Sequence, residues 1–313
     1  MNAPPIIDTA QHPLATGCPP RWASGWGQDR YGVFVEFTLQ EVTQRLRWIP
    51  PGRFWMGSPE NEPGRFDSEG PRHQVMLTKG FWLFDTPCTQ ALWQAVMGGN
   101  PSRFQSPTRP VENVSWYDVQ DFLARINARI PGLDLTLPSE AQWEHACRAG
   151  TETAIYTGDL AILGDNNAPA LDPIAWYGGN SGVDFDLDNG CDSSDWKEKQ
   201  YLHTKAGTRS VKLKRANTWS LYDMLGNVWE WCQDHWHDNY EGVPTDGSAW
   251  EDRNVGASRV VRGGSWYGYA HNVRAAYRDA YPPDYRVDDV SFRCAQVRVA
   301  ERGTGAVKSC RAG

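Results

Sequence analysis

Aspartates recur between positions 184 and 195 at the spacing of an oxygen-rich cation loop. Such loops bind calcium through about six to eight carboxylate, carbonyl and water oxygens. Position 6 of the segment is Asn189 rather than glycine, and position 12 is aspartate where a glutamate usually binds with both oxygens. The segment therefore indicates either a calcium loop or a solvated acidic loop. Its candidate ligands are Asp184, Asp186, Asp188, Asp192 and Asp195.

The segment 267–291 is enriched in tyrosine and small polar residues. It holds five of the twelve tyrosines in 25 of the 313 residues, where uniform scattering would place about one. Mixtures of Tyr, Asp, Asn and Ser are typical of recognition loops, because rigid rings lie beside adaptable hydrogen-bonding groups. The alternative is that the tyrosines belong to the core or to an ordinary loop. The candidate ligand-binding residues are Tyr267, Tyr269, Ala270, His271, Asn272, Tyr277, Asp279, Tyr281, Asp284, Tyr285, Asp288 and Asp289.

Chemistry based on thiols, imidazoles or phosphate loops has less support. Seven cysteines are scattered singly with no C-x-x-C pair, which favours reduced thiols over a disulfide framework or a four-cysteine zinc site. An H-x-H pair alone is a weak metal signal, so we expect a structural role for Cys232, Asp234, His235, His237 and Asp238. The motifs of nucleotide-binding loops and of the common hydrolases are absent from the sequence.

Local patterns predict the elements that position these residues. Three helices are indicated by N-cap signals followed by apolar residues at helical spacing. Their bounds are Thr86-Pro87 to Gly98, Ser115 (in a capping box with Asp118) to Pro131, and Ser139 (in a box with Gln142) to Gly150. Alternating apolar residues predict a hairpin of strands at 31–39 and 42–48, and strand-like pieces at 260–261, 273–277 and 292–299.

The whole chain is predicted to be one mixed α+β domain with much irregular structure, because 151–258 is rich in Gly, Asp, Asn and Trp without clear elements. We expect a poorly ordered lead at 1–25, the domain at 26–300 and a tail at 301–313. The net charge of 31 − 38 = −7 gives no reason to expect nucleic acid. No apolar run is long enough to span a membrane, and no signal layout opens the chain, so we expect a cytoplasmic protein.

Six phrases in order over residues 48–293 resemble the formylglycine-generating-enzyme family, also called the sulfatase-modifying-factor domain. The resemblance implies a C-type-lectin-like fold with few helices and short twisted strands. The family holds enzymes and non-enzymes on one scaffold, so the site must decide the function. The phrases are WIPPGRFWMG (48–57), GPRHQV (70–75), NVSWYD (113–118), LPSEAQWE (137–144), LYDMLGNVWEW (221–231), and RGGSW (262–266) with Phe292-Arg293.

The resemblance also bears on metals. Oxidases of this family carry two copper-binding cysteines shortly after Gly-Gly-Ser-Trp, and Cu(I) requires such soft ligands. Residues 266–274 contain no cysteine, so we expect no copper and no catalytic residue. Related enzymes bind calcium at a Gly-Asn-x-Trp-Glu motif, which corresponds here to Gly226, Asn227, Val228 and Glu230. The alternative is that Asn227 and Glu230 hydrogen-bond a buried turn or a framework arginine such as Arg274.

Segment 267–291 most resembles the C-terminal segment of variable proteins encoded by diversity-generating retroelements. In those proteins a fixed frame surrounds positions rewritten at adenines, which yields Tyr, Asp, His, Asn, Ser, Gly and Ala. The resemblance implies a non-catalytic protein that binds a protein or another macromolecule. The alternatives are an oxidoreductase or accessory protein of unknown substrate. The frame here is Gly263, Gly264, Trp266, Arg274, Arg278, Pro282, Phe292 and Arg293.

Overall fold

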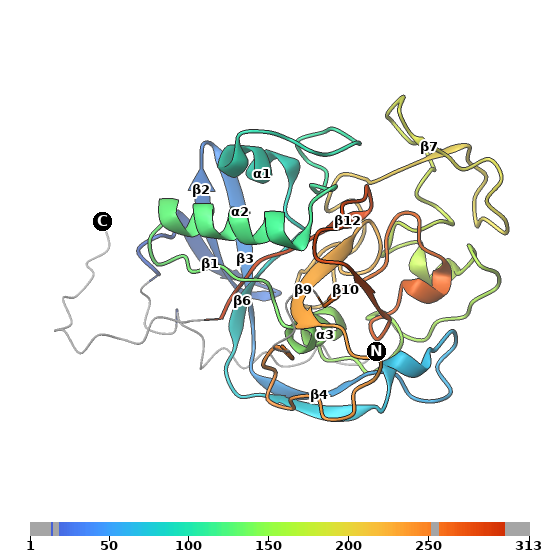
Figure 1. Cartoon of the computed structure of the whole chain (residues 1–313), viewed down its shortest axis with the longest axis horizontal. Helices are drawn as coiled ribbons and strands as arrows, with labels where there is room; N and C mark the ends of the chain where they lie inside the picture. Colours follow the sequence, from blue (N-terminus) through green and yellow to red (C-terminus); the bar gives the residue numbers. More distant parts are fainter. Residues whose placement is uncertain (1–13, 15–18, 252–256, 298–313) are drawn as a thin grey trace.

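The computed structural model describes residue 14, residues 19–251 and residues 257–297 (Figure 1). The predicted tail at 301–313 lies outside the described residues, as does most of the predicted lead at 1–25. Among the described residues no helix combines the length and the apolar character that crossing a membrane requires.

The first sheet has five strands in the order β1-β2-β3-β6-β13. Its strands are β1 (Gly25–Asp29), β2 (Gly32–Leu39), β3 (Val42–Ile49), β6 (Phe81–Phe84) and β13 (Ala295–Gln296). The predicted hairpin is confirmed, since β2 pairs antiparallel with β3 and Val35 lies opposite Leu46. Val33, Val35 and Phe37 alternate along β2 and are buried, so the period-2 pattern correctly marks the face of β2 that packs into the core.

Three α-helices form where N-cap side chains satisfy the first free N–H groups. They are α1 (Gln90–Met97), α2 (Trp116–Arg129) and α3 (Glu140–Arg148). The capping boxes of α2 and α3 are confirmed, as Ser115 and Ser139 accept from Asp118 N and Gln142 N. The predicted start of α1 is wrong: Thr89 is the N-cap, because the preceding Cys88 is held extended by backbone bonds to Val111 and Phe292.

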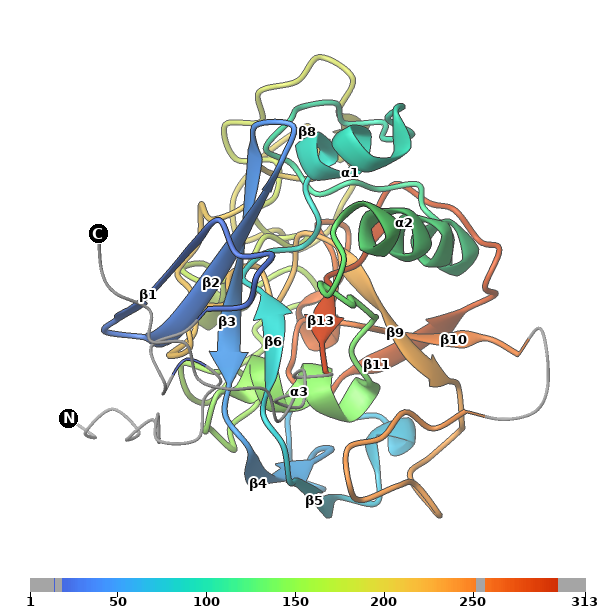
Figure 2. The same cartoon turned by 90° about the vertical axis from the view of Figure 1, so that its left-hand side faces the viewer.

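The second sheet has the order β11-β10-β9-β12 and lies beside α3 (Figure 2). Its strands are β9 (Trp229–His235), β10 (Arg259–Arg262), β11 (Arg278–Tyr281) and β12 (Val290–Ser291). β9 is a seven-residue strand that the sequence patterns did not predict. Two further pairs complete the sheets: β4 (Gly52–Met56) with β5 (His73–Leu77), and β7 (Cys191–Asp192) with β8 (Lys205–Ala206).

The predicted strand at 273–277 is wrong. These residues follow a short 3-10 helix (Ala270–Asn272), and the strand begins only at Arg278. The reason is that their backbone is satisfied by other partners: Ala275 N donates to the carbonyl of Ala154, and Arg262 donates to the carbonyls of Ala275 and Ala276. The predicted piece at 292–299 is a strand only at Ala295–Gln296, within the part of it that the structure describes.

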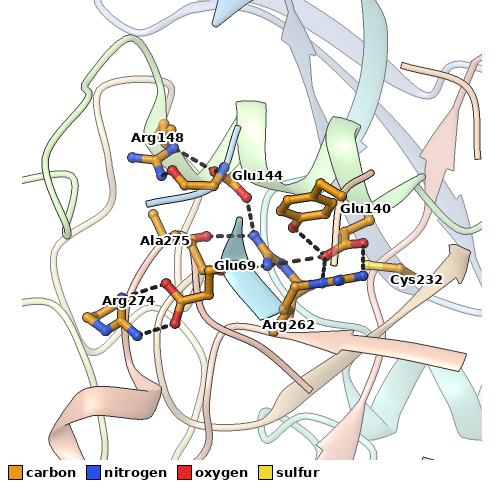
Figure 3. A network of polar contacts seen from close by, with 12 residues as sticks. Glu69, Glu140, Glu144, Arg148, Cys232, Arg262, Arg274 and Ala275 are labelled. Atoms are coloured by element: carbon orange, nitrogen blue, oxygen red, sulfur yellow. Dashed lines mark hydrogen bonds and ion pairs between the residues drawn. The ribbon is translucent and has the colours of Figure 1, made fainter. Parts of the chain in front are cut away.

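Buried ion pairs tie α3, the second sheet and the loop 62–69 together (Figure 3). Arg278 pairs with Glu140 at 2.8 Å, and Arg262 pairs with both Glu140 and Glu144. Arg274 pairs with Glu69 at 2.5 Å on the other side of the same region. The buried arginines therefore join segments that lie far apart in the sequence. Loops of the region 151–228 lie opposite β1 and β2 in Figure 1 and complete the domain.

Candidate functional site

A sharp turn after β10 divides neighbouring side chains between the core and the surface. Gly263 and Gly264 have φ values of +97° and +76°, which favour glycine. A Cβ on Gly264 would also lie 2.9 Å from Val273 and 3.0 Å from the carbonyl of Asn272. The turn buries Trp266, which is 2% exposed, and leaves the next residue, Tyr267, 55% exposed.

Most of the candidate binding residues reach the surface. Tyr269 and Tyr285 are 48% and 44% exposed, and Asp284 is exposed. His271, Asn272, Tyr277, Asp279, Tyr281 and Asp288 are partly exposed. Two of the predicted ligand-binding residues are instead buried: Ala270 is fully buried and Asp289 is 8% exposed. Ala270 packs in the core, and its backbone N–H donates to the carbonyl of Asp165. The carboxylate of Asp289 accepts a hydrogen bond from the hydroxyl of Ser265.

Some of these rings contact one another, and a second loop packs against them. Phe66 lies 5.5 Å from His271 and 5.4 Å from Tyr277, and Tyr269 lies 5.6 Å from His271, between ring centroids. Tyr281 and Tyr285 form a separate pair with their ring centroids 5.1 Å apart. We call this set the tyrosine face: Phe66, Trp196, Tyr267, Tyr269, His271, Tyr277, Tyr281 and Tyr285. Phe66 was not among the predicted site residues.

A cavity of about 350 Å³ opens at one end of the tyrosine face. The rings of Tyr267 and Trp196 meet edge to face with their centroids 5.1 Å apart, and Trp196 in turn stacks on the buried Trp266 at 6.1 Å. Five of the seven lining residues come from irregular loops of the 151–228 region. The lining residues are Asp165, Asn166, Asp195, Trp196, Lys197, Tyr267 and Tyr269.

The sequence reasoning missed Asp165, Asn166, Trp196 and Lys197, and it assigned Asp195 only as a metal ligand. The available signal was the high tryptophan content, sixteen residues in all, which pointed to aromatic anchors without saying which ones are exposed. A larger hollow of about 590 Å³ lies between α2 and the loop 247–249, but no charged or aromatic side chain lines it. The chemically distinctive cavity is therefore the one at the tyrosine face.

Residues 33–298 match the model of the family described as "Sulfatase-modifying factor enzyme 1-like domain". The chain belongs to this family. Its fold is the C-type-lectin-like fold of the formylglycine-generating-enzyme type, as predicted. Few helices, short strands and long irregular loops are the features that the prediction named, and all three are observed.

Relatives of this sulfatase-modifying-factor domain carry different names. A formylglycine-generating enzyme of Thermomonospora curvata is 30% identical, over 82% of this chain and 94% of that protein. A protein of Paenibacillus barcinonensis named chaperone protein LppX is 28% identical, over 63% of this chain and 73% of its own. The solved structure of Treponema denticola variable protein 1 is similar with a TM-score of 0.64 and 27% identity, covering 85% of this chain and 99% of that one.

The calcium motif implied by the family resemblance is occupied by protein groups. Both carboxylate oxygens of Glu230 accept from Arg293 at 2.7 Å, and one also accepts from the indole of Trp143 at 2.7 Å. The side chain of Asn227 bonds the backbone N–H and carbonyl of Arg209. The framework arginine that pairs with Glu230 is thus Arg293; the suggested Arg274 pairs with Glu62 and Glu69 instead.

The acidic segment 184–195 is an exposed loop in this domain. Asp186 pairs with Arg109, Asp192 caps the N–H of Ser194, and Lys205 donates to the carbonyl of Asp188. Over the described residues, no three His, Cys, Asp or Glu side chains come together in a way that would hold a metal ion. Calcium binding at either place stays a prediction, and the loop has the more accessible carboxylates.

Most of the described cysteines are packing residues. Cys88, Cys232 and Cys294 are fully buried, and burial raises the pKa of each thiol well above its usual value. A buried neutral thiol is a poor nucleophile and a poor metal ligand. The cluster around Cys232 has a structural role as predicted: Asp234 accepts the N–H groups of Glu140 and Trp250, and His237 stacks on Trp250 at 3.5 Å.

Asp289 beneath the tyrosine face is expected to make stability depend on pH. Burial raises the pKa of its carboxyl from 3.8 to about 6, opposed by the hydrogen bond from Ser265. A carboxyl whose pKa is raised by folding contributes stability that is complete below about pH 4 and is lost as the pH rises through about 6. Relative to Asp289→Asn, the wild type should lose on the order of 2 kcal/mol between pH 4 and pH 7.

Urea unfolding of both proteins across this pH range measures that difference. Carboxyls that do not interact with Asp289 titrate identically in the two proteins and cancel, which leaves Asp289 and its charged neighbours Asp279 and Asp288. A difference in free energy of unfolding that stays constant from pH 4 to pH 7 would show that Asp289 does not titrate as its burial requires.

Proposed function

We propose that this protein is a non-catalytic binding protein that displays the tyrosine face to a protein or another macromolecular ligand. The observation that carries the proposal is the division of segment 267–291 into a buried frame and exposed rings. Trp266, Arg274, Arg278 and Phe292 are buried, while Tyr267, Tyr269 and Tyr285 are exposed. Side chains that leave the frame intact when they change are suited to recognition.

We further propose that a retroelement diversifies this face. The similarity to Treponema denticola variable protein 1 extends over 85% of the chain and supports this reading. The filling of the exposed positions with Tyr, Asp, His and Asn agrees with adenine-directed substitution. The codons of these positions should be derivable from adenine-containing template codons, and a near-copy of the segment and a reverse transcriptase gene should lie nearby. Without them, the diversification proposal fails and the binding proposal remains.

The second candidate function is a formylglycine-generating oxidase, favoured by the 30% identity to such an enzyme. Segment 267–291 has no cysteine, and each described cysteine except Cys191 is buried. Incubation with copper, oxygen and a peptide bearing a sulfatase-type cysteine should yield no formylglycine, because the described residues offer no accessible thiolate pair to bind Cu(I). Turnover above a control without protein would favour the oxidase.

Selection from a displayed random-peptide library tests the binding function. The face variant carries Tyr267→Ser, Tyr269→Ser and Tyr285→Ser, and the matched control carries Trp26→Ser, Met76→Ser and Leu213→Ser, which are also exposed but lie elsewhere. Peptides selected on the wild type should bind the face variant at least about tenfold more weakly, since aromatic anchors at an interface each contribute about 2 kcal/mol or more. The control should bind as the wild type does.

Peptides that bind the face variant as tightly as the wild type would overturn the proposal. Melting curves of all three proteins accompany the selection, so that a loss of folding is not counted as a loss of binding.

A further inference from the structure

The cavity at the end of the tyrosine face is partly walled by the aromatic side chains of Trp196, Tyr267 and Tyr269. Elsewhere the domain stacks its own arginines on rings: Arg259 lies 4.0 Å from the ring centre of Trp116, and Arg278 lies 4.3 Å from that of Trp236. Among the described residues no Lys or Arg lies over Trp196, Tyr267 or Tyr269. Trp196 is flanked by Trp266 and Tyr267, whereas Tyr267 and Tyr269 are 55% and 48% exposed and remain available to a cation from outside.

The charged groups around the cavity are mainly carboxylates. Asp165 and Asp195 are exposed, and within the described part of the chain neither carboxylate has an ion pair or a hydrogen bond. Glu198 lies next to them, because its carboxylate accepts the N–H of Asp165 at 2.8 Å. Lys197 is the one cation in the lining. The lining itself holds two carboxylates and one ammonium, a net negative charge, with Glu198 and Lys199 beside it.

The neighbouring histidine does not offset this charge. Burial and the adjacent Arg274 lower the pKa of His271, so its ring is neutral at pH 7. An anionic group in the cavity would meet the carboxylates of Asp165 and Asp195. A purely apolar group would remove these carboxylates from water without giving them a partner, which is costly. A cation interacts favourably with both the aromatic rings and the carboxylates.

We infer that this cavity takes the cationic side chain of an arginine or lysine from a protein ligand. The inference rests on the proposed binding function and names the chemistry of its partner. The volume of about 350 Å³ is at the small end for a ligand site, which suits one side chain rather than a whole cofactor. The rest of the tyrosine face would then contact the residues on either side of the inserted one.

Binding of two short peptides tests this inference. The probe is acetyl-Gly-Arg-Gly-amide, and its neutral counterpart replaces arginine with citrulline, which has nearly the same shape. Saturation-transfer NMR and calorimetry should show that the arginine peptide binds at least about tenfold more tightly and that sodium chloride weakens its binding. The corresponding lysine peptide should also bind more tightly than the citrulline peptide. Equal binding of the arginine and citrulline peptides, or no binding of either at millimolar concentration, would overturn the inference.

Two pairs of substitutions place the effect in the cavity. Asp165→Asn with Asp195→Asn should weaken binding of the arginine peptide about tenfold. Glu41→Gln with Asp134→Asn removes the same charge at distant exposed positions and should leave binding unchanged. Equal losses in both variants would mean that only net charge matters, and the inference would fail.

The same variants separate this inference from the proposed function. If the peptides selected from the library lose binding to the face variant but not to Asp165→Asn with Asp195→Asn, the tyrosine face binds ligands and the cation inference is wrong. If the face variant binds the selected peptides as tightly as the wild type does, the proposed binding function is wrong, whatever the result for Asp165→Asn with Asp195→Asn.

Discussion

Trp266→Ala is expected to lower the free energy of unfolding by about 3–5 kcal/mol, whereas Tyr267→Ala should change it by less than about 0.5 kcal/mol. Trp266 is buried against Phe104 at 5.3 Å, and its indole donates to the carbonyl of Asp288. Its removal leaves a cavity and an unpaired carbonyl in the frame. Tyr267 lies on the surface, so its loss removes only its ring contacts with Trp196 and Trp266.

Urea unfolding of Trp266→Ala and Tyr267→Ala measures this contrast. Because the two residues are adjacent, any effect of alanine on the local backbone is similar in both variants. The contrast is the physical basis of the proposed function, since a face can vary only if it does not support the fold. Similar losses from both variants would show that the tyrosine rings belong to the core and that the binding-face proposal is wrong.

Arg274→Met is expected to cost about 3–5 kcal/mol, because it removes the partner of two buried carboxylates. The guanidinium pairs with Glu62 at 2.6 Å and with Glu69 at 2.5 Å, and it also donates to the carbonyls of Gly64 and His271. In Figure 3 it lies at the edge of the buried network that includes Arg262. The loss should be larger at pH 8 than at pH 5, since an unpaired buried carboxyl is stable only when it is protonated.

Urea unfolding of the wild type and of Arg274→Met at both pH values gives this difference. Arg125→Met serves as the control, since Arg125 makes an exposed ion pair with Asp121 on α2 and its loss should leave stability unchanged. A loss for Arg274→Met no larger than that of the control would mean that the loop 62–69, which carries Phe66, is held in place by other contacts.

Several features of this domain could be predicted from short stretches of sequence. The hairpin of β2 and β3 and the capping boxes of α2 and α3 depend on residues at most a few positions apart along the chain. The frame was also predictable: Trp266, Phe292 and Arg274 are buried as the family resemblance implied. Local spacing is sufficient in these cases because the interactions that form the element are themselves local.

The remaining features depend on partners that lie far away in the chain. Pro87 has the pattern of a first helical residue. However, the backbone of Cys88 hydrogen-bonds Val111 and Phe292, so α1 begins only at Gln90. Apolar residues alternate in the segment 273–277 as they do in a strand. However, the carbonyls of Ala275 and Ala276 accept hydrogen bonds from the guanidinium of Arg262. Backbone groups form hydrogen bonds with the partners that folding brings near, and the local sequence does not predict those partners.

The candidate site shows the same limit. The composition of segment 267–291 identified the exposed tyrosines, because rings beside small polar groups are a local property. It did not identify Phe66 or Trp196, which lie about 200 and 70 residues earlier in the chain and complete the face and its cavity. Nor did it show that Ala270 and Asp289 are buried. Burial and cavity shape depend on how distant loops pack together, so the tertiary structure alone reveals them.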